Sequence, residues 1–156
     1  MSKMRCKWAI CFLLGLGLCA AIDQRPMDDF GSSCDPRSIK VDGRHATAVC
    51  RTILGDLRCS RVDLTECIKN SYGSLQADPK ESGPSFFQEC FNCSNKPQTG
   101  GLATSAPTFL HCQCDPKTGA PRSNWPAAVM DINTVIDNID GILQCNGRHG
   151  MLWHGC

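Results

Sequence analysis

A short pattern occurs twice in this chain, and the duplication constrains the fold more than any other feature of the sequence. Residues 62–76 align without gaps on residues 130–144, with six identities in 15 positions. Repeated segments fold as similar units that stack on one another. A half-chain of this size buries little surface by itself, so we expect the two halves to share one core. The identical pairs are Asp63/Asp131, Ile68/Ile136, Asn70/Asn138, Gly73/Gly141, Leu75/Leu143 and Gln76/Gln144.

The similarity of the halves extends upstream of the aligned segments. In each half a phenylalanine precedes a cysteine by four residues, and a second cysteine follows: Phe30, Cys34 and Cys50, then Phe86, Cys90 and Cys114. The extra residues of the second half fall in 94–107, where Gly, Pro, Ser and Thr indicate an enlarged loop, and near 115–126. The predicted organisation is a leader 1–21, repeat one 28–76, a polar linker 77–83, repeat two 84–145 and a C-terminal tail 146–156.

The local patterns favour an all-β fold. Segment 44–53 is compatible with short strands, and no long amphipathic helix occurs. Segments 70–73 and 138–141 suit hairpin turns, because Asn, Asp and Gly tolerate positive φ angles. Apolar residues four apart in 64–68 and 132–136 predict a short helical turn before each hairpin.

The N-terminus has the pattern of a secretory signal peptide. A basic cluster at residues 3–7 precedes an apolar run at 8–18 and small residues at 19–21. A membrane-spanning helix is the alternative, but the run is shorter than the roughly 20 residues that a bilayer requires. Lipid attachment at Cys19 is a further alternative, disfavoured by the bulky Leu18 before it. We therefore expect a secreted, extracellular protein with no membrane insertion.

Cysteines dominate the remaining composition. Removal of residues 1–21 leaves an even number of them, which in an exported chain predicts a disulfide framework. The near-balance of 16 Lys+Arg against 15 Asp+Glu argues against nucleic-acid binding, which needs a basic face. The ten cysteines are Cys34, Cys50, Cys59, Cys67, Cys90, Cys93, Cys112, Cys114, Cys145 and Cys156.

Together these motifs resemble the cyanovirin-N homology family, and the resemblance covers nearly all of the chain after the leader. The pattern is Phe-x3-Cys, a second cysteine, and Asp-[Leu/Ile]-x3-Ile-x-Asn-x2-Gly-x-Leu-Gln, present in order in both halves. The resemblance implies a pseudo-two-fold all-β fold in which each lobe pairs a three-stranded sheet with a β-hairpin from the other repeat. It also implies a lectin that binds mannose-rich glycans with one shallow pocket per lobe, without metal, cofactor or catalysis.

The family's binding positions map onto two sets of residues. The second-lobe set is Lys69, Asn70, Tyr72, Ser85, Gln88, Glu89, Asp115 and Lys117. The first-lobe set is Asp29, Ser32, Ser33, Arg51, Ile53, Asp137, Asn138 and Asp140. Asn70 and Asn138 have an alternative role as turn residues that hold the hairpins.

This sequence departs from the family pattern within both sets. Arg51 replaces an acid, Ile53 replaces a small hydroxyl residue, and Tyr72 replaces an aspartate in its turn. Pro116 and its neighbouring insertion reshape the second-lobe wall. We expect the second lobe to retain binding better, because Tyr72 offers a stacking face and a polar cluster remains, formed by Lys69, Asn70, Gln88 and Glu89.

The resemblance implies two disulfides, Cys34–Cys50 and Cys90–Cys114. If the second pair faces across a hairpin, Cys93 and Cys112 form a natural second rung. The pairing of the remaining four cysteines stays open. A zinc site at residues 90–114 is an alternative that a secreted setting disfavours, and a redox Cys-x-x-Cys enzyme lacks its βαβ context.

Other features have competing interpretations. No Gly-x-Ser-x-Gly or His-Glu-x-x-His motif occurs, and the paired acids Asp28-Asp29 and Asp137/Asp140 are more typical of turns than of a glycosidase. Asn92-Cys93-Ser94 is a glycosylation sequon at Asn92. The tail could form a clasp closed by Cys156, with Trp153 either packed on the fold or exposed to a partner.

Two functional hypotheses follow. The first is a secreted lectin whose partners are glycans or glycoproteins. The second is a secreted protein-binding effector on a lectin scaffold that has lost sugar binding. In either case we expect a monomer or a domain-swapped dimer, since the proline-bounded linker permits exchange of halves.

Overall fold

The structure is a computed structural model that describes residues 30–78, 85–96 and 108–156. The predicted leader 1–21, residues Asp28 and Asp29, most of the linker, and residues 97–107 of the enlarged loop lie outside the described residues. No helix among the described residues is long and apolar enough to cross a membrane.

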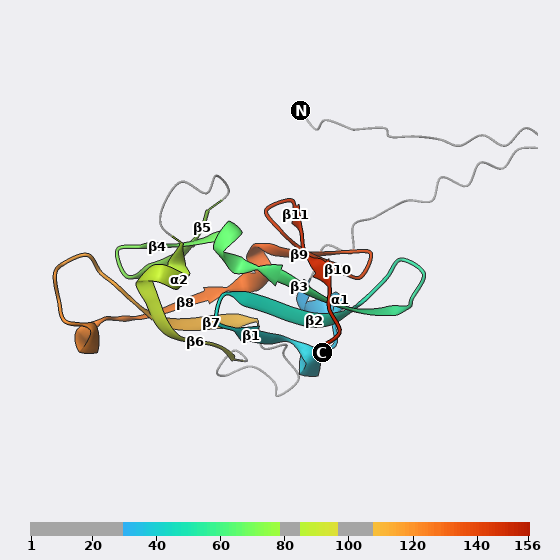
Figure 1. The fold of residues 1–156 in the computed structure, drawn as a ribbon, viewed down its shortest axis with the longest axis horizontal. Coiled ribbons are helices and arrows are strands. Elements are labelled where there is room, and N and C mark those ends of the chain that lie inside the picture. The colour runs from blue at the N-terminus through green and yellow to red at the C-terminus, as the bar shows by residue number, and fades with distance from the viewer. Residues whose placement is uncertain (1–29, 79–84, 97–107) are drawn as a thin grey trace, which may run out of the picture.

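Each half of the chain builds a three-stranded antiparallel sheet that follows a short helix (Figure 1). In the first half α1 (Phe30–Ser33) and a 3-10 turn, η1 (Pro36–Ser38), precede the sheet order β1-β2-β3. In the second half α2 (Phe86–Glu89) precedes the sheet order β6-β7-β8. The strands are β1 (Lys40–Asp42), β2 (His45–Arg51), β3 (Leu57–Asp63), β6 (Cys90–Lys96), β7 (Phe109–Cys114) and β8 (Ala127–Asp131).

The two aligned segments form β-hairpins that exchange places between the halves. Hairpin β4–β5 from repeat one packs against α2 and β8, whereas hairpin β9–β10 from repeat two packs against α1 and β3 (Figure 1). We call β1–β3 with β9–β10 the first lobe, and β6–β8 with β4–β5 the second lobe. This arrangement confirms the predicted interlocked pseudo-two-fold fold. The hairpin strands are β4 (Ile68–Ser71), β5 (Ser74–Ala77), β9 (Ile136–Ile139) and β10 (Ile142–Cys145).

A capped helical turn precedes each hairpin, as predicted. The turns are η2 (Leu64–Glu66) and η4 (Ile132–Thr134). The Asp63 Oδ1 atom accepts a hydrogen bond from the Thr65 N–H at 3.0 Å, and Asp131 Oδ1 accepts one from Asn133 N–H at 3.0 Å. An aspartate satisfies the otherwise unpaired N–H at the start of such a turn, which explains why both repeats carry it.

The core lies between each sheet and the hairpin that it receives. Its members come from the positions that the repeats share. The duplicated sequence pattern is therefore mainly a set of side chains that pack in the core. Large side chains with at most 1% exposure include Phe30, Phe86, Leu64, Ile132, Ile68, Ile136, Leu110 and Leu143.

Five disulfides join the ten cysteines. Cys34–Cys50, Cys90–Cys114 and Cys93–Cys112 form as expected. The two open pairings are Cys59–Cys156 and Cys67–Cys145, with separations of 97 and 78 residues. Both connect segments that are distant in sequence. The sulfurs at residues 90–114 are therefore bonded to one another and are not thiolates available to zinc.

The C-terminal tail extends both sheets of the first lobe. Its β11 (Arg148–His149) pairs with β10, and its β12 (Met151–Leu152) pairs with β3. Gly150 lies at the crossing, where an added Cβ would collide with the carbonyl oxygen of Arg61. The tail is thus a clasp that Cys59–Cys156 closes.

Candidate functional site

The two repeat asparagines have matching roles in their hairpin turns. Asn70 Oδ1 accepts a hydrogen bond from Gly73 N–H at 2.9 Å, and Asn138 Oδ1 accepts one from Gly141 N–H at 2.9 Å. The glycines have φ angles of 84° and 82°, which an L side chain rarely adopts. The asparagine and glycine of each repeat therefore specify the same turn.

The amide groups of these asparagines fasten each hairpin to its lobe. Asn70 Nδ2 donates to the Asp115 carbonyl at 2.8 Å, and Asn138 Nδ2 donates to the Arg51 carbonyl at 2.9 Å. Asp115 and Arg51 each follow the second cysteine of an equivalent disulfide. The turn-holding role proposed for both asparagines is thus present, and it places Asp115 and Arg51 in equivalent positions of the two lobes.

A polar cluster forms at one end of the second lobe. Glu89 Oε2 accepts a hydrogen bond from Asn70 Nδ2 at 3.2 Å, and Glu89 Oε1 contacts the ammonium group of Lys117. The Lys117 N–H donates to Asp115 Oδ1 at 2.8 Å, and the Asp115 N–H donates to the Glu89 carbonyl at 2.9 Å. The structure thus brings together Asn70, Glu89, Asp115 and Lys117, and their role in binding stays a prediction.

The other predicted second-lobe residues lie around this cluster or away from it. Lys69 alternates with Asn70 along β4, so its side chain faces the other side and pairs with Asp78 at 3.7 Å. Ser85 forms a backbone bridge with Lys69, and the Gln88 side chain is exposed. Strand alternation thus places the Lys69 side chain on the other side of β4 from Asn70, and its role in binding stays a prediction.

Tyr72 occupies a turn position with a φ of 51° and is 78% exposed. Its turn packs against the insertion after β7, where a Cβ on Gly73 would lie 2.9 Å from Pro126 and 3.4 Å from Pro116. The insertion therefore packs against the turn of the β4–β5 hairpin.

The insertion 115–126 is braced by an aromatic group that sequence reasoning missed. The rings of Phe91 and Trp125 meet edge to face at 5.7 Å, and the Arg122 guanidinium lies 4.2 Å from the Phe91 centroid. Trp125 Nε1 donates to the Ala120 carbonyl at 3.1 Å. Cation–π and edge-to-face contacts of this kind hold a loop to its sheet. No spacing rule signals them, since Phe91 and Trp125 are distant in sequence.

The first-lobe site has a different charge pattern. Asp140 Oδ1 accepts a hydrogen bond from the Ile53 N–H at 2.9 Å, and its Oδ2 lies 3.2 Å from Arg58 Nη1. Arg58 also donates to the Asp140 carbonyl at 3.0 Å. Asp140 is therefore an internally paired acid, held by Arg58 and by the Ile53 N–H. Sequence reasoning did not identify Arg58, because Arg58 and Asp140 are far apart in the chain and meet only when the β9–β10 hairpin packs on the first lobe.

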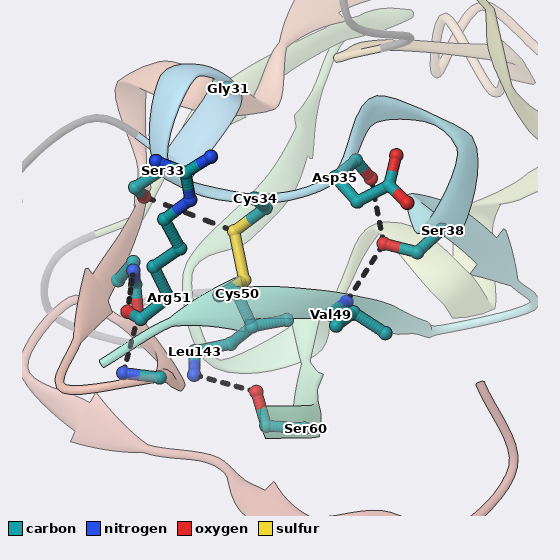
Figure 2. Close-up of a disulfide and its surroundings, with 12 residues drawn as sticks. Gly31, Ser33, Cys34, Asp35, Ser38, Val49, Cys50, Arg51, Ser60 and Leu143 are labelled. Atoms are coloured by element: carbon teal, nitrogen blue, oxygen red, sulfur yellow. Dashed lines mark hydrogen bonds between the residues drawn. A yellow bond between two sulfur atoms is a disulfide. The ribbon is translucent and has the colours of Figure 1, made fainter. Parts of the chain in front are cut away.

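The remaining first-lobe residues surround the Cys34–Cys50 disulfide. Ser33 is buried, with its Oγ 3.9 Å from Cys34 Sγ, and Ser32 is exposed. The Arg51 side chain extends from the end of β2 toward Ser33 and α1 (Figure 2). Asp137 alternates with Asn138 along β9, as Lys69 does with Asn70 along β4.

Asn92 lies at a β-bulge where two residues of β6 oppose one residue of β7. It is exposed, has a φ of 52°, and donates from Nδ2 to Gln113 Oε1 at 3.0 Å. The bulge is what allows Cys93 to reach Cys112. The sequon is thus presented at the surface, and its modification stays a prediction.

Comparison with known proteins agrees with the fold. The family model of the CVNH domain matches residues 30–144. The NMR structure of GzCVNH from Gibberella zeae has a TM-score of 0.58 at 24% identity, covering 73% of this chain and 94% of that one. A search of curated protein sequences finds no match.

Two further similar structures contain saccharides. Microvirin in complex with mannobiose has a TM-score of 0.57 at 24% identity, covering 76% of this chain and 99% of that one. A MoCVNH3 variant in complex with (N-GlcNAc)4 has a TM-score of 0.56 at 14% identity, with the same coverage. These structures share the fold of this chain. Since the family model spans most of the sequence, the chain belongs to the CVNH family.

Proposed function

We propose that this protein is a secreted lectin that recognises mannose-type or related glycans through the second lobe, without metal and without catalysis. The observation that carries the proposal is the fixed polar cluster of Glu89, Asp115 and Lys117. Polar groups held in place before binding lose little entropy when a sugar arrives. They also reject sugars whose hydroxyl groups leave them unpaired. Mannobiose and an N-acetylglucosamine oligomer in the two related complexes support saccharide recognition.

The decisive test is calorimetry of the oxidised protein with oligomannose and with N-acetylglucosamine oligomers, guided by a glycan array. We expect binding that Glu89→Gln weakens at least about tenfold, equivalent to about 1.4 kcal/mol, because the charge that orients Lys117 is lost. Glu66→Gln is the matched control, since Glu66 pairs with Arg148 at 3.9 Å outside the cluster. Absence of binding to all oligomannose, chitin and glucan probes would reject the lectin proposal.

Export is part of the same proposal. A framework of five disulfides is typical of proteins that mature in an oxidising compartment. Expression in eukaryotic cells, followed by N-terminal sequencing of the protein in the medium, should give a chain that starts after Ala21. Retention of residues 1–21 on a membrane-bound product contradicts the proposed signal peptide.

Protein binding is the second candidate function, and exposed apolar side chains favour it. Leu54 at the β2–β3 turn is 88% exposed, while Met151 and Leu152 on the tail are 65% and 60% exposed. The two candidates are separated by measuring how tightly this protein binds a secreted glycoprotein before and after that glycoprotein is enzymatically deglycosylated. Binding that survives deglycosylation and is lost in Leu152→Ser supports a protein-binding surface, whereas binding that is lost with the glycan supports the lectin.

A further inference from the structure

The pseudo-two-fold symmetry places opposite charges in equivalent positions of the two lobes. Asn138 holds the Arg51 carbonyl at 2.9 Å as Asn70 holds the Asp115 carbonyl at 2.8 Å. A second difference lies beside the first cysteine of each equivalent disulfide, where Ser33 in the first lobe corresponds to Glu89 in the second. The first lobe thus exchanges two carboxylates for one guanidinium and one hydroxyl.

The main chain around Arg51 is firmly anchored. The Asn138 side chain that binds its carbonyl is fully buried, and the next residue, Thr52, is 2% exposed. Thr52 Oγ1 accepts a hydrogen bond from the Asp56 N–H at 3.0 Å, and the Ile53 N–H donates to Asp140 at 2.9 Å. Arg51 therefore projects from a fixed base, which reduces the entropy lost when its guanidinium binds a ligand.

One acid of the first-lobe set, Asp140, already has partners within the protein. Asp140 pairs with Arg58 at 3.2 Å and accepts the Ile53 N–H, so its charge is satisfied without Arg51. Across residues 30–78, 85–96 and 108–156, no carboxylate lies within ion-pair distance of the Arg51 guanidinium. In the second lobe, by contrast, the Lys117 ammonium contacts Glu89. The first-lobe cation is exposed and available to an anion.

We infer that the first lobe binds a saccharide that carries a carboxylate, such as a uronic acid residue; this rests on the proposed lectin function. The planar guanidinium of Arg51 would donate two parallel N–H bonds to the sugar carboxylate, a geometry that arginine provides and lysine does not. Ile53, which follows Arg51 by two residues and is 50% exposed, would offer an apolar face to the sugar ring. The two lobes would then bind different glycans, an acidic one and a neutral one.

The test is calorimetric titration of the oxidised protein with trigalacturonic acid, with its neutral methyl ester, and with mannotriose. We expect the acid to bind at least tenfold more tightly than the ester, and Arg51→Gln to remove that preference. Arg51→Lys should recover only part of it, because the two-point contact is lost. The matched control is Arg37→Gln, which removes an exposed charge from η1; Ser38 at the end of η1 lies on the far side of the Cys34–Cys50 disulfide from Arg51 (Figure 2).

The outcomes separate this inference from the proposed function. Equal binding of acid and ester, or an unchanged preference in Arg51→Gln, overturns the inference while mannotriose binding at the second lobe stands. Tighter binding of mannose 6-phosphate than of galacturonic acid also overturns the carboxylate assignment. Absence of binding to trigalacturonic acid and its ester overturns the inference, and the lectin proposal falls with it only if mannotriose and the oligomannose, chitin and glucan probes also fail to bind. Because the Arg51 side chain is exposed, the variant should keep the wild-type thermal midpoint, which serves as the folding check.

Discussion

Asn70 and Asn138 illustrate how a residue at a predicted binding position can be occupied by the fold itself. In each asparagine the side-chain Oδ1 accepts a hydrogen bond within the turn, and the side-chain Nδ2 donates one from the hairpin to the sheet. Asn138 is fully buried, whereas Asn70 is 8% exposed. Their identity in both repeats is explained by these structural bonds, and ligand recognition is left to the side chains around them.

Replacement of Asn138 tests this structural role. Asn138→Ala leaves the Arg51 carbonyl and the Gly141 N–H without their partners, so we expect a loss of about 2 kcal/mol in the free energy of unfolding. The measurement is guanidinium unfolding of the oxidised protein. Asn124→Ala, at an exposed residue of η3 (Arg122–Asn124), is the control and should change stability by less than about 0.5 kcal/mol. Equal effects of the two variants contradict the structural role.

His45 is the titratable residue beneath the tail whose environment opposes protonation. Burial and then the neighbouring Arg61 guanidinium lower its pKa below 6.5, and Arg44 acts in the same direction. The carboxylates of Asp63 and Asp42 raise this pKa, but by less than the other effects lower it. The ring contacts Arg61, whose guanidinium in turn lies 4.5 Å from the Trp153 centroid, so the charge state of His45 is coupled to the tail.

This pKa predicts a pH dependence of stability. The unfolded chain binds a proton at His45 more readily than the folded protein, so stability should fall as the pH drops below about 6.5 toward the folded pKa. We expect His45→Gln to lose less unfolding free energy between pH 7 and pH 5 than the wild type loses. Thermal unfolding at both pH values measures the difference. An identical decrease in both proteins would show that His45 does not cause it.

The tail shows at the element scale how a segment beyond the repeats became part of the fold. Two two-residue strands pair with β10 and β3, and neither is long enough to be stable alone. The Trp153 N–H donates to the Cys59 carbonyl at 3.0 Å, next to the disulfide that closes the tail. Trp153 is packed against Arg61 yet remains 37% exposed, so both interpretations of this residue hold in part.

Removal of the Cys59–Cys156 bridge tests how much the tail depends on it. Since Cys67–Cys145 already connects the same regions, the bridge closes an effective loop of about 20 residues and is worth about 3 kcal/mol on the chain-entropy model. The double variant Cys59→Ala/Cys156→Ala should lose stability on that order. It should also lose hydrogen-exchange protection at Met151 and Leu152. Unchanged protection there would show that strand pairing alone holds the tail.

At the scale of the whole molecule, two disulfides tie repeat one to residues that come after it. Cys67 in repeat one bonds Cys145 at the end of repeat two, and Cys59 bonds Cys156 in the tail. The other three bridges stay within one repeat. The exchanged hairpins are therefore interlocked by packing and also by covalent bonds.

This covalent lock predicts the behaviour of a domain-swapped dimer. If two chains exchange halves before oxidation, Cys67 of one chain bonds Cys145 of the other, and the dimer becomes covalent. We expect any swapped dimer separated by gel filtration to persist in SDS without reductant and to become monomeric with it. Slow interconversion of oxidised monomer and dimer without reductant contradicts the pairing described here.

The sequence by itself determined the local structure and the duplication. Asp63, Asn70, Gly73 and their counterparts in repeat two specify caps and turns through contacts within a few residues, so the pattern alone predicted the two hairpins. Three of the five disulfides also followed, because their cysteines occupy family positions or the adjacent rung of one hairpin.

Only the tertiary structure decided which partners meet across the molecule. The bridges to Cys145 and Cys156, the pairing of Arg58 with Asp140, and the separation of Lys69 from Glu89 all depend on how the exchanged hairpins and the tail seat against the sheets. Such contacts join residues far apart in the chain, where spacing carries no information. The charge difference between the lobes has the same origin, because Arg51 and Asp115 become comparable only after both hairpins have docked.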